Sequence, residues 1–109
     1  MDAYEELMEQ AREVEIFFKS TQLRSIPLIT RSKLTHKVVD CPDRDEAVLR
    51  LAFFAAQNGF NAMIEVDVVS EKIKNKSRSY QQLKWDAVGV AAQVDKEKLA
   101  RMDLLGNKG

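Results

Sequence analysis

A capped and strongly apolar helix in the middle of the chain constrains the fold more than any other feature. Asp43, with Glu46 three residues later, forms a capping box that opens the helix. The run from Glu46 to Asn58 is rich in helix formers and carries apolar residues on more than one side, which is typical of a buried helix. Gly59 then predicts a C-cap in the left-handed conformation. A second layer of structure must therefore pack against this helix.

Alternation of apolar and polar residues predicts three strands around the helix. Residues 33–39, 61–69 and 80–94 each repeat with the period of two that a half-buried strand has. The residues expected to share one face are Ala62, Ile64, Val66 and Val68 in the second strand and Leu83, Trp85, Ala87, Gly89 and Ala91 in the third. Residues 70–79 are polar and are predicted to form a loop, so the last two strands are expected to make an antiparallel hairpin.

The segments that flank these strands predict a connector and two further helices. Over residues 2–19 apolar residues recur every three or four positions and form one narrow seam, made of Tyr4, Leu7, Ala11, Val14 and Phe18. This seam must be covered by the rest of the domain or by another copy of the chain. Residues 20–32 are typical of an extended connector, and Asp95 is a suitable cap for a short last helix.

The length of 109 residues indicates a single domain, residues 1–109. We expect an N-terminal helix over residues 1–20, a β-α-β-β core over residues 33–94 and a short C-terminal helix over residues 95–105. The fold class is α+β, with a three-stranded antiparallel sheet and one buried helix across it. Such a sheet leaves one face and its edges uncovered, which favours closure by the flanking helices or by further copies.

The corner between the central helix and the next strand carries a resemblance to a known family. Residues 59–64, Gly-Phe-Asn-Ala-Met-Ile, match the Gly-Ala-Asn-Ala-apolar-apolar turn of the YbjQ-like family, with Phe60 in place of the usual alanine. The domains of this family are described as heavy-metal-binding. Residues 88–91, Val-Gly-Val-Ala, resemble the end of that family's last strand. The resemblance covers residues 33–94. It implies a β-α-β-β fold and ring-like homo-oligomers, often pentamers, but no established activity; the N-terminal helix lies outside the family's pattern.

The sequence offers few ligands for a metal and few groups for nucleophilic catalysis. It contains one histidine and one cysteine, His36 and Cys41, whereas a metal site needs three or four converging ligands. Along a strand, five residues span roughly 16 Å, so these two side chains are not expected to act as a nucleophile and its base. We predict that His36 lies on a strand face and that Cys41 is a small apolar residue before the helix. Copies in a ring are the one arrangement that would bring such ligands together.

Paired carboxylates on the second strand also have a structural explanation. Glu65 and Asp67 share a face of the strand, and Lys84 and Asp86 share one on the neighbouring strand. Interleaved opposite charges favour cross-strand ion pairs over acid–base catalysis. We therefore predict no catalytic residue, no cofactor and no metal ion, and expect that the protein is not an enzyme.

The charge of the chain is balanced, with one local exception. Seventeen basic and seventeen acidic residues give zero net charge, so no global field attracts nucleic acid or an anionic membrane, and neither is expected as a partner. Four cations alternate with other residues in the predicted loop, and we take these as candidate anion-binding residues: Lys72, Lys74, Lys76 and Arg78. The single cysteine, the acidic N-terminus and the short apolar runs favour the cytoplasm.

These features predict a non-enzymatic domain that assembles with itself into a homo-oligomer. A small ligand or ion, of unknown identity, would then bind at the subunit junctions. The residues expected at the interface are Tyr4, Leu7, Ala11, Val14, Phe18 and Trp85. The alternative from another functional class is an RNA- or phosphate-binding module that uses the basic loop over residues 72–78.

Overall fold

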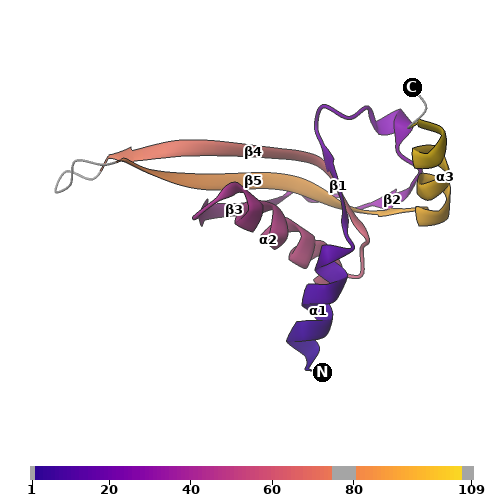
Figure 1. The fold of residues 1–109 in the computed structure, drawn as a ribbon, viewed down its shortest axis with the longest axis horizontal. Helices are drawn as coiled ribbons and strands as arrows, with labels where there is room; N and C mark the ends of the chain where they lie inside the picture. Colours follow the sequence, from indigo (N-terminus) through magenta and orange to yellow (C-terminus); the bar gives the residue numbers. More distant parts are fainter. Residues whose placement is uncertain (1, 75–80, 107–109) are drawn as a thin grey trace.

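The computed structural model describes residues 2–74 and 81–106, which form an α+β fold with a mixed sheet (Figure 1). The elements in chain order are α1 (Ala3–Arg12), β1 (Glu15–Phe18), the 3-10 turn η1 (Leu23–Ser25), β2 (Leu28–Arg31), β3 (His36–Cys41), α2 (Arg44–Gln57), β4 (Ala62–Lys74), β5 (Gln81–Val94) and α3 (Lys96–Gly106). The predicted order of a strand, a helix and two strands is confirmed in β3, α2, β4 and β5. The short C-terminal helix is confirmed in α3.

The sheet has five strands, so the predicted number of three is wrong. Its order is β1-β4-β5-β2, and β3 also pairs with β5. The predicted antiparallel hairpin of β4 and β5 is confirmed. Strand β1 pairs in parallel with the edge of β4 that faces away from β5. Both β2 and β3 run antiparallel to β5. Strand β2 pairs with residues 92–94 of β5 and β3 with residues 85–89, so together they form one interrupted edge strand.

The predicted N-terminal helix over residues 1–20 is too long. Helix α1 ends at Arg12, and Glu15, Ile16, Phe17 and Phe18 form the strand β1 instead. Aromatic and β-branched side chains fit a pleated surface better than a helix. In β1 they alternate, because Ile16 and Phe18 pack on the side of α2 while Phe17 packs on the opposite face of the sheet.

Helix α2 begins and ends as the sequence predicts, within two residues. The Asp43 carboxylate accepts a hydrogen bond of 2.7 Å from the backbone N–H of Glu46, and Gly59 has a φ of +80°, the left-handed conformation of a helix C-cap. The helix lies across one face of the sheet, here called the helix face (Figure 1). Its fully buried residues Ala47, Leu51 and Ala55 belong to the main core cluster.

Two bulges interrupt the simple alternation along the strands. Glu65 in β4 and Asp40 in β3 have φ values of 56° and 58°, and the strand register shifts at both positions. A bulge places one extra residue opposite its neighbour and so reverses the faces beyond it. Val66 therefore packs with Met63 on the helix face, while Ile64 packs on the opposite face. The prediction that Ile64 and Val66 share a face is wrong for this reason.

A second, smaller core lies on the opposite face of the sheet, at the end near α3. Its buried residues are Ile26, Ala62, Ile64, Val90, Ala92 and Val94, with Phe17 packed against them. Asn61 joins the two hairpin strands here, because its side-chain amide donates to the Val94 carbonyl and accepts from the Val94 N–H, at 3.0 and 2.8 Å. The segment around Ile26, predicted as an extended connector, thus covers part of this face.

Candidate functional site

The apolar seam predicted to form an interface is largely packed within its own chain. Ala11 is 2% exposed, Val14 is buried, and both belong to the core cluster beneath α2, with Leu7 packed against it. Tyr4 is 63% exposed and its ring lies 5.8 Å from that of Phe53 on α2. The residues at positions 7, 11 and 14 are therefore covered by this domain itself.

The two remaining residues predicted at the interface come from strands. Phe18 lies on β1 and is half-buried, with the guanidinium of Arg44 stacked 5.0 Å from its ring centre. Trp85 on β5 is half-buried against the main core, between Ser70 of β4 and Cys41 of β3 in the sheet register. Both side chains therefore already have partners within the chain.

The hairpin of β4 and β5 extends well beyond the body of the domain (Figure 1). The polar segment predicted as a loop over residues 70–79 is a continuation of β4 as far as Lys74, and its residues stay in register with β5, as in the pairs Glu71–Lys84 and Lys72–Leu83. The carboxylate of Glu71 and the ammonium of Lys84 are 3.4 Å apart. Cross-strand pairing thus makes residues 70–74 a strand although their polar composition is typical of a loop. We call residues 70–74 and 81–85 the arm.

One backbone edge of the arm is unpaired in the described part of the chain. Pairing of β1 with β4 ends at Val66, and the last backbone hydrogen bond along this edge runs from the Lys19 N–H to the Val66 carbonyl, at 2.9 Å. Backbone groups of a strand point alternately to either side. The N–H and C=O groups of Val68, Ser70 and Lys72 therefore point outward, away from β5. We call this edge of β4, over residues 67–74, the outer edge.

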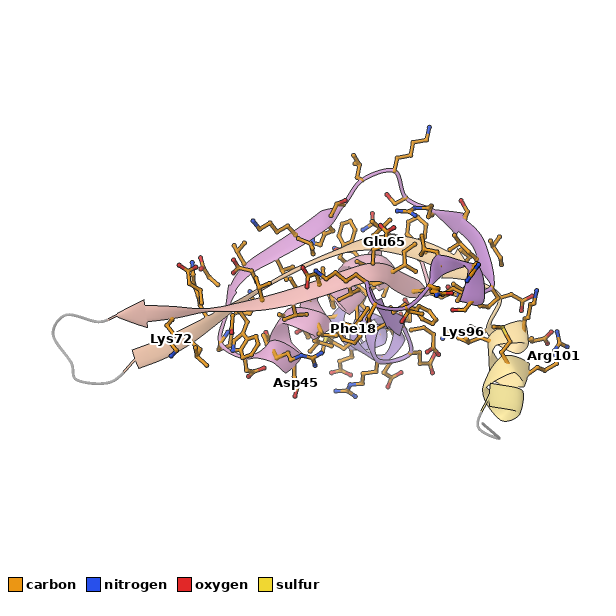
Figure 2. All side chains as sticks on the ribbon, turned by 90° about the horizontal axis from the view of Figure 1, so that it is seen from above. Phe18, Asp45, Glu65, Lys72, Lys96 and Arg101 are labelled. Carbon is orange, nitrogen blue, oxygen red and sulfur yellow. The ribbon has the colours of Figure 1, made fainter. Side chains whose placement is uncertain are left out.

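Apolar side chains are exposed around the arm. Val69 on β4 is 54% exposed, Leu83 on β5 is 47% exposed and Val39 on β3 is 47% exposed. Figure 2 shows the labelled Lys72 on this projecting part of the hairpin, well away from Phe18 and Asp45 on the body. An uncovered edge flanked by apolar side chains is the usual setting for strand addition.

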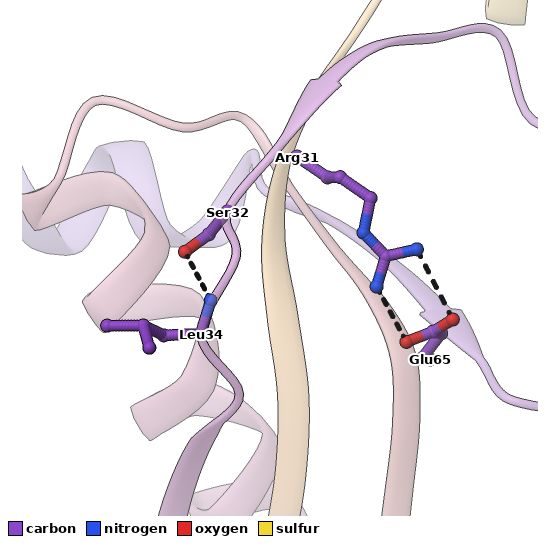
Figure 3. A network of polar contacts seen from close by, with 4 residues as sticks. All are labelled: Arg31, Ser32, Leu34 and Glu65. Carbon is purple, nitrogen blue, oxygen red and sulfur yellow. Dashed lines mark hydrogen bonds and ion pairs between the residues drawn. The ribbon is translucent and has the colours of Figure 1, made fainter.

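The carboxylate of Glu65 forms a cross-sheet ion pair (Figure 3). The guanidinium of Arg31 on β2 donates two hydrogen bonds to it, at 2.9 and 3.4 Å. Arg31 pairs with β5 in the sheet register, so the ion pair links the edge strand β2 to β4 across the central strand. Glu65 is also the bulge residue of β4 with the positive φ.

Three further carboxylates form ion pairs with lysines. Asp67 lies 3.1 Å from the ammonium of Lys19, and Lys84 lies 3.1 Å from Asp40 in addition to its contact with Glu71. The hydrogen bond to Asp40 is the main cause that raises the pKa of Lys84 above its ordinary value. Glu65 and Asp67 thus lie in ion pairs, as expected, but their partners are Arg31 and Lys19 and not Lys84 of the neighbouring strand.

His36 and Cys41 have structural surroundings. The imidazole of His36 stacks on the ring of Phe54 with 3.6 Å between ring centres. Cys41 is fully buried, and its thiol donates a weak hydrogen bond to the Val39 carbonyl. Burial raises the pKa of the Cys41 thiol, which opposes formation of a nucleophilic thiolate. Among the described residues there is no group of three or more His, Cys, Asp or Glu side chains that could hold a metal ion.

Acid is expected to weaken the packing of His36. Burial lowers the pKa of His36 below its ordinary value of 6.5, so the unfolded chain binds a proton at a higher pH than the folded chain does. The free energy of unfolding should therefore fall as the pH drops from above 6.5 through the folded-state pKa. Urea unfolding at pH 7.5 and 5.5 measures this decline, and His36→Phe should reduce it while keeping an aromatic stack. An equal decline in both proteins would contradict the prediction.

The described clefts are shallow. One of about 230 Å³ lies where α1 and α2 end and α3 begins, and there the ammonium of Lys96 donates to the backbone carbonyl of Glu13. Another of about 290 Å³ lies beside the start of the outer edge and is lined by Phe18, Arg44 and Val68 among others. In the described residues every buried side-chain N or O atom has a hydrogen-bond partner.

The candidate anion-binding residues are only partly described. Lys72 is exposed on β4. Lys74 is the last residue of β4, but its side chain lies outside the described part, and so do Lys76 and Arg78 altogether. The prediction of an anion-binding loop therefore remains a prediction.

No family model, curated protein sequence or solved structure matches this chain. The resemblance of residues 33–94 to the YbjQ-like family therefore also remains a prediction. Among the helices in the described residues, none has the length and apolar character needed to cross a membrane.

Proposed function

We propose that this chain is a non-enzymatic domain that assembles with copies of itself through the arm. The observation that carries the proposal is the outer edge of β4, whose outward N–H and C=O groups at Val68, Ser70 and Lys72 have no backbone partner in the described residues. The exposed side chain of Val69 lies on this edge strand, and that of Leu83 lies on the neighbouring strand β5. This location replaces the helical seam that the sequence suggested.

An unpaired strand edge favours association because its hydrogen-bonding groups are satisfied when another strand is added. The apolar side chain of Val69 loses contact with water in the same step. The zero net charge of the chain supports the proposal further, since copies do not repel each other through a large overall charge.

A proline at Ser70 tests this function. Proline lacks the N–H group, and at Ser70 that group points away from β5, so Ser70→Pro should remove a contact at the outer edge while the hairpin ladder is kept. We expect multi-angle light scattering to give a multimer for the native chain and for Ser70→Ala, and the mass of a monomer for Ser70→Pro. An unchanged multimer with Ser70→Pro would place the contact elsewhere, and a monomeric native chain would refute self-assembly.

Several finer features belong to the same proposal. The order β3-α2-β4-β5 supports membership of the YbjQ-like family, whose ring-like assembly would be one form of self-association. A small ligand or ion would bind where subunits meet. The single cysteine, held as a buried thiol, suits the reducing cytoplasm.

RNA or phosphate binding is the second candidate function, favoured by the exposure of Lys72 on the arm. It predicts salt-sensitive binding of a single-stranded RNA, lost when Lys72, Lys74, Lys76 and Arg78 are changed to alanine together. Fluorescence anisotropy at two salt concentrations measures this. Equal anisotropy for the native chain and the fourfold variant would refute it.

A further inference from the structure

We infer that the outer edge of β4 pairs antiparallel with the same edge of a second copy, with Ser70 on the two-fold axis. This inference rests on the proposed self-assembly and specifies its contact surface and register. The axis stands perpendicular to the sheet, so that two copies of β4 lie side by side and the sheets of both copies become continuous. A contact of this kind uses one patch on both subunits and closes on itself.

The two-fold axis restricts which residues can oppose each other. In an antiparallel pair, residues directly opposite lie on the same face of the sheet. A rotation about the perpendicular axis keeps each face on its own side. Opposed positions in the two copies must therefore differ by an even number, and the axis passes through a residue and not between two residues.

Charge selects one register among those that remain. An axis at Val69 would place Asp67 opposite Glu71 of the second copy, an axis at Glu71 would oppose two glutamates, and an axis at Lys72 would oppose two lysines. Like charges directly opposite each other are destabilising. An axis at Val68 would leave only residues 67–69 to pair, because β1 occupies the edge as far as Val66.

An axis at Ser70 avoids each of these conflicts and pairs residues 67–73. Val68 then lies opposite Lys72 of the second copy, and Val69 lies opposite its Glu71. The carboxylate of Glu71 keeps its own partner, Lys84, on the neighbouring strand. The outward backbone groups of Val68, Ser70 and Lys72 can all form hydrogen bonds across the junction.

The same register covers an exposed apolar side chain. Val69 is 54% exposed in the single chain. With Ser70 on the axis, Glu71 of the second copy lies directly opposite Val69, where its aliphatic stem covers part of the valine, and the two copies of Val69 are diagonal neighbours on the same face, roughly 7 to 8 Å apart. Pairing therefore satisfies the edge and reduces the exposed apolar area together.

A cysteine at the axis tests the register. Ser70 opposes itself in a hydrogen-bonded pair, for which the Cα atoms are about 5.5 Å apart, within the range of a disulfide. Ser70→Cys should give a covalent dimer on mild oxidation with copper phenanthroline. In Lys72→Cys, the matched control, the two cysteines are offset by four residues along the strands, roughly 13 Å, and should not cross-link. The native chain controls for Cys41, which is fully buried.

Light scattering of the same samples separates the inference from the proposed function. A dimer that cross-links through Ser70→Cys and not through Lys72→Cys supports both. A multimer that cross-links through Lys72→Cys only, or through neither, or that has the mass of a five-membered ring, overturns the two-fold register and leaves self-assembly standing. A native chain that is monomeric overturns both.

Discussion

Val14→Asp is expected to lower the free energy of unfolding by about 3 kcal/mol or more, because it places a charged carboxylate at a buried position of the core. Val14 is 9% exposed and lies in the cluster formed with Ala11 and Leu51 beneath α2. The substitution removes buried methyl groups as well, which adds to the loss. Urea unfolding followed by far-ultraviolet circular dichroism measures the change, at a protein concentration where the native mass of both proteins is the same.

Tyr4→Asp is the matched control for this prediction. Tyr4 belongs to the same predicted seam, but it is 63% exposed and contacts the ring of Phe53 from outside the core. Its replacement should cost about 1 kcal/mol or less. If Val14→Asp instead kept the stability of the native chain and lowered its mass in solution, the seam would be covered by another copy and its packing under α2 would be wrong.

The seam of Tyr4, Leu7, Ala11, Val14 and Phe18 shows that local structure is predictable from the sequence, whereas long-range strand pairing is not. The spacing of Tyr4, Leu7 and Ala11 belongs to helix α1. The same spacing continues to Val14 and Phe18 by coincidence, because α1 ends at Arg12 and Phe18 lies in strand β1. β1 exists through its parallel pairing with β4, which lies far along the chain. A contact of that range leaves no trace in local periodicity, whereas the cap at Asp43 and the end at Gly59 are local and were predictable.

The bulges illustrate a second limit. At Glu65 and Asp40 the backbone takes a left-handed conformation that is typical of glycine, at a cost of about 1 kcal/mol or more for other residues. Glu65 gives no sign of this conformation in the sequence, and Asp40, although aspartate adopts it more often than most residues, is not distinguished from the other aspartates of the chain. The strand alternation was predicted correctly along β5, where no bulge occurs, and incorrectly along β4, where the bulge at Glu65 moves Val66 to the helix face.

The candidate site was missed for a related reason. The outer edge exists because β1 ends at Phe18 while β4 continues to Lys74. This difference depends on the lengths of two paired strands, one of which was predicted as a helix. The polar residues from Ser70 onward look like a loop, and only their register with β5 shows them to be strand.

Gly89→Val is expected to lower the free energy of unfolding by about 2 to 3 kcal/mol, through overpacking of the core opposite the β4 bulge. A Cβ atom at position 89 would lie 3.0 Å from the Met63 Cε and 3.1 Å from the Val66 Cγ2. The end of Met63 is flexible, but it is fully buried and has little room to move, and the β-branched Val66 is stiff. A strand usually gains up to about 1 kcal/mol when glycine is replaced by a β-branched residue, so the steric term should prevail.

Two further variants show whether crowding is the cause of this loss. Gly89→Ala adds one methyl group and should cost less than Gly89→Val. Combining Gly89→Val with Met63→Ala removes the closest contact, so the combined loss should be smaller than the sum of the two separate losses. Gly59→Ala controls for the loss of a glycine as such, because no atom lies within 4 Å of its Cβ and only its φ of +80° opposes the change, at about 1 kcal/mol. Strict additivity in the double variant would show that Met63 and position 89 do not compete for the same space, and the glycine would then be needed for its backbone alone.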